Sequence, residues 1–237
     1  MKIKRPAVDY RRLNLQTVKT EEFRHVLLLL YWPVYGLLFL FVERFFPVTQ
    51  YHVMHCGLDD MIPFCEWFLI PYLFWFVYLI GMHLYTLFYD VDAFRHLMKY
   101  IIFTYTVTIV IYFLFPTCQH LRPDTFARDN LLTKLMAAIY QFDTDTNVCP
   151  SLHVIGSMAV LSTACYSKTI RSRAWKIGFG AVAFLICLST MFLKQHSALD
   201  VLTAIPVCII AEIFSRLPLR KAARAGAPRQ ALEERKE

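Results

Sequence analysis

The stretch VLLLLYWPVYGLLFLFV (Val26–Val42) contains no charged residue, and neither does YIIFTYTVTIVIYFLFPT (Tyr100–Thr117). Each is about as long as the ~17–25 residues that an α-helix needs to cross a bilayer. Of the 237 residues, 57% are hydrophobic and only 18% are charged, whereas a soluble domain carries about 25% charged residues. The sequence therefore excludes an ordinary soluble enzyme, a disordered protein and a disulfide-rich secreted module, and it predicts an integral membrane protein.

Six charge-poor runs predict an all-α bundle of six transmembrane helices. They are Val26–Val42, Trp67–Tyr89, Tyr100–Thr117, Cys149–Ser167, Ile177–Leu193 and Ala198–Ser215. Asp200 and Glu212 interrupt the last run, so both carboxylates are expected to face the bundle interior or water. The predicted organisation is a basic N-terminal arm (1–25), a six-helix membrane domain that carries the site (26–215) and a basic tail (216–237).

The basic residues are distributed unequally between the two sides of this predicted bundle. Most lie in the two end segments and in the second-to-third and fourth-to-fifth connections, whereas the other side holds only Arg44, Arg122, Arg128, Lys134 and Lys194. Because cytoplasmic loops retain positive charge, both termini are expected in the cytoplasm, as an even number of spans also requires. The net charge of +7 lacks the aromatic-interleaved pattern of a nucleic-acid-binding face, so no nucleic-acid partner is expected.

Three polar clusters follow predicted helix ends on the side that carries few basic residues. They are CQHLRPD (Cys118–Asp124), NVCPSLH (Asn147–His153) and LKQHSALD (Leu193–Asp200). Because all three would lie at one membrane face, they are expected to form a single site.

In the third cluster, His196 and Asp200 have a spacing of four, which places two side chains within reach of each other on a helix. A carboxylate that accepts a hydrogen bond from one imidazole nitrogen fixes the tautomer and leaves a lone pair on the other nitrogen. This is the arrangement of a nucleophile or general base. A structural His–Asp pair is the alternative for this motif alone.

In the second cluster, Pro150 fits the first turn of a helix, where its missing N–H leaves no hydrogen bond unmade. Free backbone N–H groups there, with Ser151 beside them, form a site for an anion. His153 could then donate a proton to a leaving group. The alternative is a helix cap beside a buried structural histidine.

Arg122 and Lys194 add permanent positive charge at the same level of the bundle. Arginine offers a fork that matches phosphate oxygens, and lysine offers a point charge. Taken singly, each is equally consistent with contact to lipid headgroups. Taken together with the histidines, they predict phosphoryl transfer through a covalent phosphohistidine.

The same motifs, in the same order, resemble the type 2 phosphatidic acid phosphatase (lipid phosphate phosphatase) and vanadium haloperoxidase superfamily, in its membrane branch. The resemblance covers roughly residues 100–215 and is carried by Arg122-Pro123, Pro150-Ser151-Leu152-His153, and Ser189 followed by His196 and Asp200.

This resemblance implies a role for each residue. His196 would be the nucleophile, Asp200 would orient it, and His153 would protonate the leaving alcohol. Arg122 and Ser151 would bind phosphate oxygens. No metal ion or other cofactor is implied, and vanadate, which mimics phosphate, is expected to inhibit.

Two positions depart from the family pattern. Phe115 stands where the family has a lysine, and Thr190 stands where it has an arginine. Lys194 could replace one of these phosphate-binding cations. In these departures the chain is similar to the divergent group that includes inositol-phosphoceramide and sphingomyelin synthases.

The sequence thus predicts a membrane-embedded phosphatase that hydrolyses a lipid phosphate monoester or diphosphate. The alternative within the same chemistry is a phosphotransferase that passes the phosphoryl group or phospho-headgroup to an alcohol. The expected location is the plasma membrane or an equivalent membrane, with the site on the non-cytoplasmic face. Nothing in the sequence indicates the particular lipid or the oligomeric state.

Two other functional classes fit parts of the sequence. A transporter or channel could use Asp200, Glu212 and Arg122 inside the bundle, although no inverted repeat supports it. A lipid-binding protein without catalytic activity would account for the two missing cations.

Three further features left alternatives open. His52, His55, Cys56 and Cys65 do not have the spacing of a regular zinc site, so a Cys56–Cys65 disulfide is favoured over zinc. Cys118–Cys149 is a second disulfide candidate. The stretch LLTKLMAAIY (131–140) could lie on the membrane surface or pack on the bundle.

Overall fold

A computed structural model describes residues 6–216, and nearly all of their regular structure is helical. The α-helices are α1 (Tyr31–Arg44), α2 (Gly57–Met61), α3 (Leu69–Tyr89), α4 (Val91–Leu114), α5 (Leu131–Phe142), α6 (Leu152–Tyr166), α7 (Arg173–Phe192) and α8 (Ala198–Arg216). Short 3-10 segments are η1 (Tyr10–Arg12), η2 (Arg24–Leu30) and η3 (Glu66–Phe68), and the two-residue strands are β1 (His52–Val53) and β2 (Thr117–Cys118). The predicted basic tail beyond Arg216 lies outside the described residues.

Five helical segments of the described chain are long and apolar enough to cross a membrane. They are Arg24–Arg44, Glu66–Tyr89, Val91–Leu114, Arg173–Phe192 and Ala198–Arg216. The prediction of a multi-pass, helical membrane protein is therefore confirmed at this level, and five of the six predicted spans have a matching helix.

The fourth predicted span, Cys149–Ser167, is shorter than expected. Its helix α6 has 15 residues, which at 1.5 Å per residue is about 22 Å, less than the ~30 Å of a bilayer core. Pro150 lies before the helix and Ser151 is its N-cap, so the expectation that Pro150 begins the helix is wrong. α6 packs against α3, α4, α7 and α8, and these neighbours cover its apolar side chains.

The third predicted span begins earlier than its hydropathy indicates. Helix α4 starts at Val91, and the side chain of Asp90 caps it by accepting a hydrogen bond from the Ala93 N–H at 3.2 Å. Arg95 and Lys99, expected in a connection, therefore lie in the first turns of the helix.

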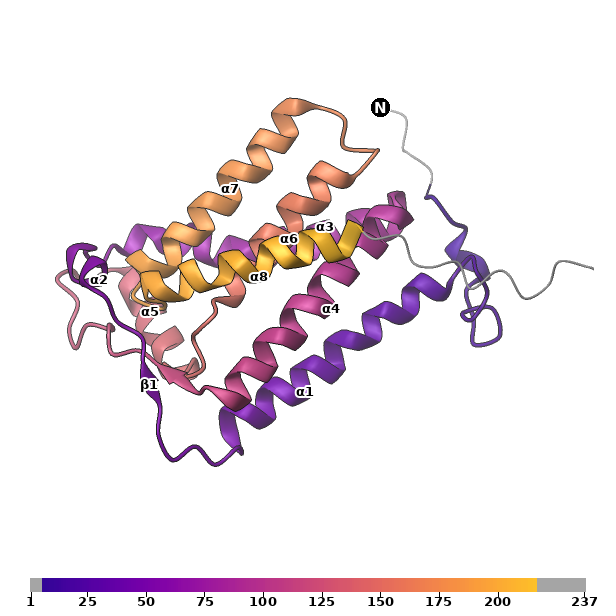
Figure 1. Cartoon of the computed structure of the whole chain (residues 1–237). Coiled ribbons are helices and arrows are strands. Elements are labelled where there is room, and N and C mark those ends of the chain that lie inside the picture. Colours follow the sequence, from indigo (N-terminus) through magenta and orange to yellow (C-terminus); the bar gives the residue numbers. More distant parts are fainter. Residues whose placement is uncertain (1–5, 217–237) are drawn as a thin grey trace, which may run out of the picture.

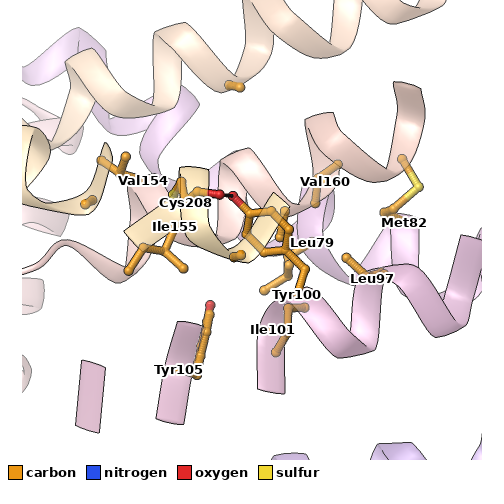
Figure 2. Close-up of a cluster of buried hydrophobic side chains, with 14 of the residues drawn as sticks. Leu79, Met82, Leu97, Tyr100, Ile101, Tyr105, Val154, Ile155, Val160 and Cys208 are labelled. Carbon is orange, nitrogen blue, oxygen red and sulfur yellow. Dashed lines mark hydrogen bonds between the residues drawn. The ribbon is translucent and has the colours of Figure 1, made fainter. Parts of the chain in front are cut away.

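The main core lies where α3, α4, α6 and α8 meet. Figure 2 shows Tyr100 of α4 among apolar side chains that include Leu79, Ile155 and Val160, with a hydrogen bond from its hydroxyl to the Cys208 carbonyl at 3.1 Å. This bond satisfies a phenol that would otherwise be buried without a partner. This core packs α3, α4 and α8 around α6, whose N-terminus carries Ser151 and His153.

The two ends of the bundle differ in character (Figure 1). At one end lie α2, α5 and the parallel pair β1–β2, in which His52 pairs with Thr117 and Val53 with Cys118. At the other end lie the N-terminal arm and the connection between α6 and α7. All three polar clusters lie at the first end, and the described basic connections lie at the second.

Gly156 generates a prediction about packing at the centre of the bundle. A Cβ added there would lie 3.0 Å from Trp75 Cζ2 and 3.1 Å from the Tyr105 hydroxyl. Gly156→Ala is expected to lower the free energy of unfolding by about 1–3 kcal/mol because overpacking forces neighbouring side chains to shift. Thermal unfolding in mild detergent measures this effect.

Gly36→Ala is the matched control for Gly156→Ala, because a Cβ on Gly36 in α1 meets no atom within 4 Å. That variant should be neutral or slightly stabilising, since alanine favours a helix over glycine by about 1 kcal/mol. Equal melting temperatures for the two variants would contradict the close approach of Trp75 and Tyr105 to Gly156.

Candidate functional site

The second and third polar clusters meet around a small cavity at the α2–α5 end. The ring centroids of His153 and His196 lie 5.7 Å apart, in an edge-to-face arrangement. The cavity measures about 80 Å³, and its lining residues are Phe39, Tyr112, Asp143, Thr144, Thr146, Asn147, Val148, Leu152, His153, Gln195 and His196. At ~30 Å³ per water, this is room for two or three waters, comparable with one phosphate group.

His196 pairs with Asp200, as the sequence predicts, but by a different local geometry. His196 lies in the turn before α8, which begins at Ala198, so the two residues do not share a helical face. Asp200 Oδ2 accepts from the Ser197 N–H at 2.9 Å and lies 3.2 Å from His196 Nδ1. One carboxylate therefore closes the N-terminus of α8, like half of a capping box, and holds the imidazole.

His153 is held by aromatic side chains of α3. Its ring stacks on Tyr72 at 4.6 Å and lies 4.5 Å from Trp75, between centroids. Gly156, one turn further along α6, leaves the space that Trp75 occupies. The imidazole orientation is thus set by packing.

Ser151 joins the second cluster to the third. Its N–H donates to the Asp200 carbonyl at 3.1 Å, so the N-termini of α6 and α8 are connected directly. The residue is fully buried, and its side chain does not cap α6. Ser151 therefore lies at a helix N-terminus, as the sequence predicts, but it is not among the cavity-lining residues.

Arg122 reaches the cavity only through a second residue. Its guanidinium donates to the carbonyls of Tyr140, Asp143 and Thr144 at 2.7–3.1 Å, and to Gln195 Oε1 at 2.8 Å. Gln195 lines the cavity and Arg122 does not. In this structure Arg122 fixes the segment after α5 and positions Gln195.

Lys194 is directed to a different partner. Its ammonium donates to the Asp59 carbonyl at 2.7 Å, and the residue adopts a left-handed φ of 53°. It is not among the cavity-lining residues. The structure thus brings together His153, His196, Asp200 and Ser151, holds Arg122 one residue away, and ties Lys194 to α2.

Phe115 and Thr190, which stand where the resemblance leads one to expect basic residues, contact neighbouring parts of the chain. The Phe115 ring stacks on His52 at 3.9 Å. Thr190 is fully buried and donates to the Cys187 carbonyl of its own helix at 2.8 Å.

Asp59 supports the His196 turn, and the sequence reading missed this role. Its carboxylate accepts hydrogen bonds from the Ser197 hydroxyl at 2.5 Å and the Ala198 N–H at 2.7 Å. Burial alone would raise the pKa of Asp59, but these bonds and those from Cys56 outweigh it and hold the pKa below its ordinary value. Asp59 is far in sequence from the clusters that contain His153 and His196, so its contact with the His196 turn could be found only from the fold.

Glu43, at the end of α1, supports the opposite wall of the cavity. Its carboxylate accepts from the hydroxyls of Thr144 and Thr146 and from Asn147 Nδ2, the last at 2.8 Å. Asn147 itself has a left-handed φ of 50°. These bonds hold the segment that precedes Ser151 in a fixed conformation.

Asp143 places a carboxyl group on the cavity wall. Its Oδ2 accepts from Gln195 Nε2 at 3.3 Å. Part of the residue contacts solvent, but removal of water from the carboxyl raises its pKa, and the nearby guanidinium groups of Arg122 and Arg44 only partly oppose this. Asp143 is not among the residues that the sequence motifs predict at the site.

Unpartnered polar atoms gather in or beside this cavity. Within residues 6–216, the buried atoms here that lack a hydrogen-bond partner are Arg122 Nε, Asn147 Oδ1, Ser151 Oγ, His153 Nδ1 and Asp200 Oδ1. Buried polar atoms are normally paired, so each exception calls for an explanation. A bound polar ligand would supply partners for such a set.

Neither candidate disulfide is present, because all seven cysteines have free thiols. Cys149 Sγ contacts the Thr203 hydroxyl at 3.1 Å, and Cys118 Sγ lies 3.8 Å from His120 Nε2. The stretch 131–140 forms α5, and its residues Leu132, Met136 and Ile139 pack against Leu69 and Tyr72 of α3. The bundle-packed alternative for this stretch is the one observed.

Comparisons with models of known protein families, with curated proteins and with solved structures found no match for this chain.

Asp59 generates a prediction about the stability of the His196 turn. Asp59→Ala leaves the Ser197 hydroxyl and the Ala198 N–H without their acceptor, which costs about 1–3 kcal/mol for a buried group. Lower thermal stability in detergent at pH 7 and faster amide exchange in residues 193–198 are expected. Asp60→Ala is the matched control, because Asp60 is exposed and pairs only with His55 at 2.8 Å.

The pH dependence of the Asp59 effect follows from the lowered pKa. A carboxylate whose folded pKa is depressed stabilises the fold above its unfolded pKa, about 3.9, and loses that contribution as the pH falls through the folded value. The difference in stability between wild type and Asp59→Ala should therefore be largest near neutral pH and shrink below about pH 4. A difference that grows as the pH falls would contradict this account.

Proposed function

We propose that the chain is a membrane-embedded lipid phosphatase that acts through a phosphohistidine on His196. The observation that carries the proposal is the pair of imidazoles on one small cavity, one of them oriented by a buried carboxylate. The unpartnered Ser151 hydroxyl and the N-terminus of α6 support it, because helix N-termini bind anions.

In the first step, the Nε2 lone pair of His196 attacks phosphorus, and the bond from phosphorus to the lipid oxygen breaks. Burial lowers the pKa of His153, so the negative charge of a bound phosphate is needed to protonate it. The resulting imidazolium gives its proton to the departing alkoxide. Asp200 holds the Nδ1 proton of His196 and balances the positive charge that develops on the ring. The products of this step are a neutral lipid alcohol and phosphohistidine.

In the second step, His153 takes a proton from a water molecule, whose oxygen attacks the phosphorus. The bond from phosphorus to nitrogen breaks, the electron pair returns to His196, and inorganic phosphate leaves. A phosphate in the cavity favours the protonated form of His153 by its negative charge. The two steps use only protein groups and water.

The substrate class follows from the place of the cavity in the bundle. It lies at one end of helices that are long and apolar enough to cross a membrane, where lipid headgroups would lie if these helices span a bilayer. A phosphate monoester or diphosphate at this depth keeps its hydrocarbon tail in the bilayer. The gathering of the described basic connections at the opposite end favours cytoplasmic termini and a site on the other face.

A phosphotransferase differs only in the acceptor of the second step. An alcohol would then replace water in the attack on phosphohistidine. Release of inorganic phosphate in buffer indicates water as the acceptor. Formation of a new phosphodiester or phosphomonoester when an alcohol is added indicates the alcohol.

His196→Ala is expected to reduce phosphate release from a short-chain lipid phosphate by at least about a thousandfold, because it removes the nucleophile. His153→Ala should reduce release about 10²- to 10⁴-fold through loss of the proton donor. His55→Ala is the matched control, since His55 lies at the same end but pairs with Asp60. Full activity of His196→Ala, in protein that unfolds at the wild-type temperature, would reject the mechanism.

The raised pKa of Asp143 leads to a prediction of how inhibition by vanadate depends on pH. Because its pKa is raised, its negative charge is lost at a higher pH than in an ordinary aspartate, and vanadate should bind more tightly as the pH falls. Asp143→Asn removes the repulsion permanently, so vanadate inhibition at pH 7 should improve about two- to fivefold with a weaker pH dependence.

Asp145→Asn is the matched control for Asp143→Asn. Asp145 lies in the same segment, 3.7 Å from His120, and does not line the cavity. Equal inhibition of the two variants at every pH would contradict a role for Asp143 at the anion site.

A further inference from the structure

A groove separate from the histidine cavity runs between α3 and α7 to the α6–α7 connection. Its volume is about 630 Å³, and its lining residues are Phe74, Val77, Tyr78, Gly81, Met82, Tyr85, Thr169, Ile170, Arg171, Ser172, Trp175 and Phe179. Its polar lining residues Thr169, Arg171 and Ser172 belong to the α6–α7 connection, which lies at the end of the bundle opposite to α2 and α5 (Figure 1). None of its lining residues belongs to the histidine cavity.

The walls of this α3–α7 groove change in character along its length. Phe74, Val77 and Phe179 make the part between the helices apolar, whereas Thr169, Arg171 and Ser172 make its end polar. A second apolar groove, also about 630 Å³, continues from Phe74 and Val77 toward the other end. Such a path fits an amphiphile with its polar group at the α6–α7 connection.

Basic side chains gather near the polar end of the groove, where Arg171 is a lining residue and the Thr169 hydroxyl donates to Asp90 Oδ2 at 3.3 Å. Lys168, Arg171, Arg173 and Lys176 lie within nine positions of the chain, and none forms an ion pair with any residue between 6 and 216. Two of them donate only to backbone carbonyls, Arg171 Nε to Lys168 at 3.2 Å and Lys176 Nζ to Cys165 at 3.2 Å. The charge at this end is therefore complementary to an anion from outside the chain.

The N-terminus of α7 lies at the same place. Its N-cap residue Ser172 lines the groove but makes no side-chain capping bond, and the first turn contains no acidic residue. Unpaired N–H groups and the helix dipole favour a phosphate at such a position. Two independent features, the cations and the helix end, thus favour the same kind of group.

The connection that carries these groups is held in place by its own hydrogen bonds. The Ser167 hydroxyl donates to Asp90 Oδ2 at 2.6 Å, and the Tyr85 hydroxyl donates to Thr169 Oγ1 at 3.0 Å. A polar end that is already ordered loses little conformational freedom when a ligand binds.

We propose that the α3–α7 groove binds an anionic phospholipid, with an acyl chain between α3 and α7 and its phosphate at Arg171 and the N-terminus of α7. The site would select lipids by headgroup charge in the leaflet that faces the basic end of the bundle. It does not depend on the reaction at His196, because it shares no residue with that cavity.

Quenching of Trp175 fluorescence by bromine-labelled lipid tests the proposal, because Trp175 lines the groove. The full chain is placed in two kinds of vesicle with the same proportions of phosphatidylglycerol and phosphatidylcholine. In one the phosphatidylglycerol chains carry bromine, and in the other the phosphatidylcholine chains do. The Trp175 signal is the difference between wild type and Trp175→Phe.

Labelled phosphatidylglycerol is expected to quench Trp175 more strongly than labelled phosphatidylcholine. Each basic side chain near a membrane surface favours an anionic lipid about fivefold. Arg171→Gln should therefore reduce the preference about fivefold, while Lys134→Gln, on α5 at the opposite end of the bundle, should leave it unchanged.

Gly81→Leu tests the acyl-chain part of the site. A Cβ on Gly81 meets no atom within 4 Å, so the larger side chain should occupy the groove without disturbing the fold, and quenching by both labels should fall. Gly36→Leu is the matched control, since Gly36 is equally open but lies on α1. Equal quenching by the two labels in wild type would overturn the proposal. So would Arg171→Gln and Gly81→Leu proteins that behave like their controls.

Discussion

The buried carboxylate of Asp200 is the constraint around which this end of the bundle is organised. A carboxylate removed from water is costly unless hydrogen bonds and opposite charge compensate it. Asp200 is fully buried, and its partners are the Ser197 N–H and His196, while its own carbonyl accepts from Ser151. Asp200 therefore connects the N-terminus of α6, through its carbonyl, with the His196 turn and the start of α8, through its carboxylate.

Support for that carboxylate comes from segments that are distant along the chain. Asp59 in α2 fixes the turn that carries His196, and Glu43 in α1 fixes the segment that leads to Ser151. In both cases a charged carboxylate accepts from hydroxyl, backbone N–H or amide donors, and such hydrogen bonds are stronger than neutral ones. The cavity between the histidines is consequently framed by ordered loops at the end of a rigid bundle.

The sequence predicted the long helices well because hydropathy reports directly on residues that lipid can surround. It overestimated α6, since a stretch such as Val154–Ala164 has the same hydropathy whether lipid or protein covers it. The pairing of His196 with Asp200 and their nearness to His153 were predicted from short spacings and a common membrane face. Asp59, Glu43 and Gln195 could not be predicted, because their roles come from contacts across tens of residues. Lys194 was expected at the phosphate position, but its left-handed backbone directs the ammonium toward α2.

The charges around the cavity bear on how an anion would be held there. The terminal nitrogens of Arg122 donate to three carbonyl groups and to Gln195. The Lys194 ammonium donates to the backbone carbonyl of Asp59. A phosphate would then meet mainly the imidazoles, the Ser151 hydroxyl and the N-terminus of α6, with the Asp143 carboxyl opposing it. Interactions that grip substrate and transition state equally lower KM without raising kcat. A site with few permanent cations, in which His196 gains positive charge only as it attacks phosphorus, would instead concentrate its stabilisation on the transition state.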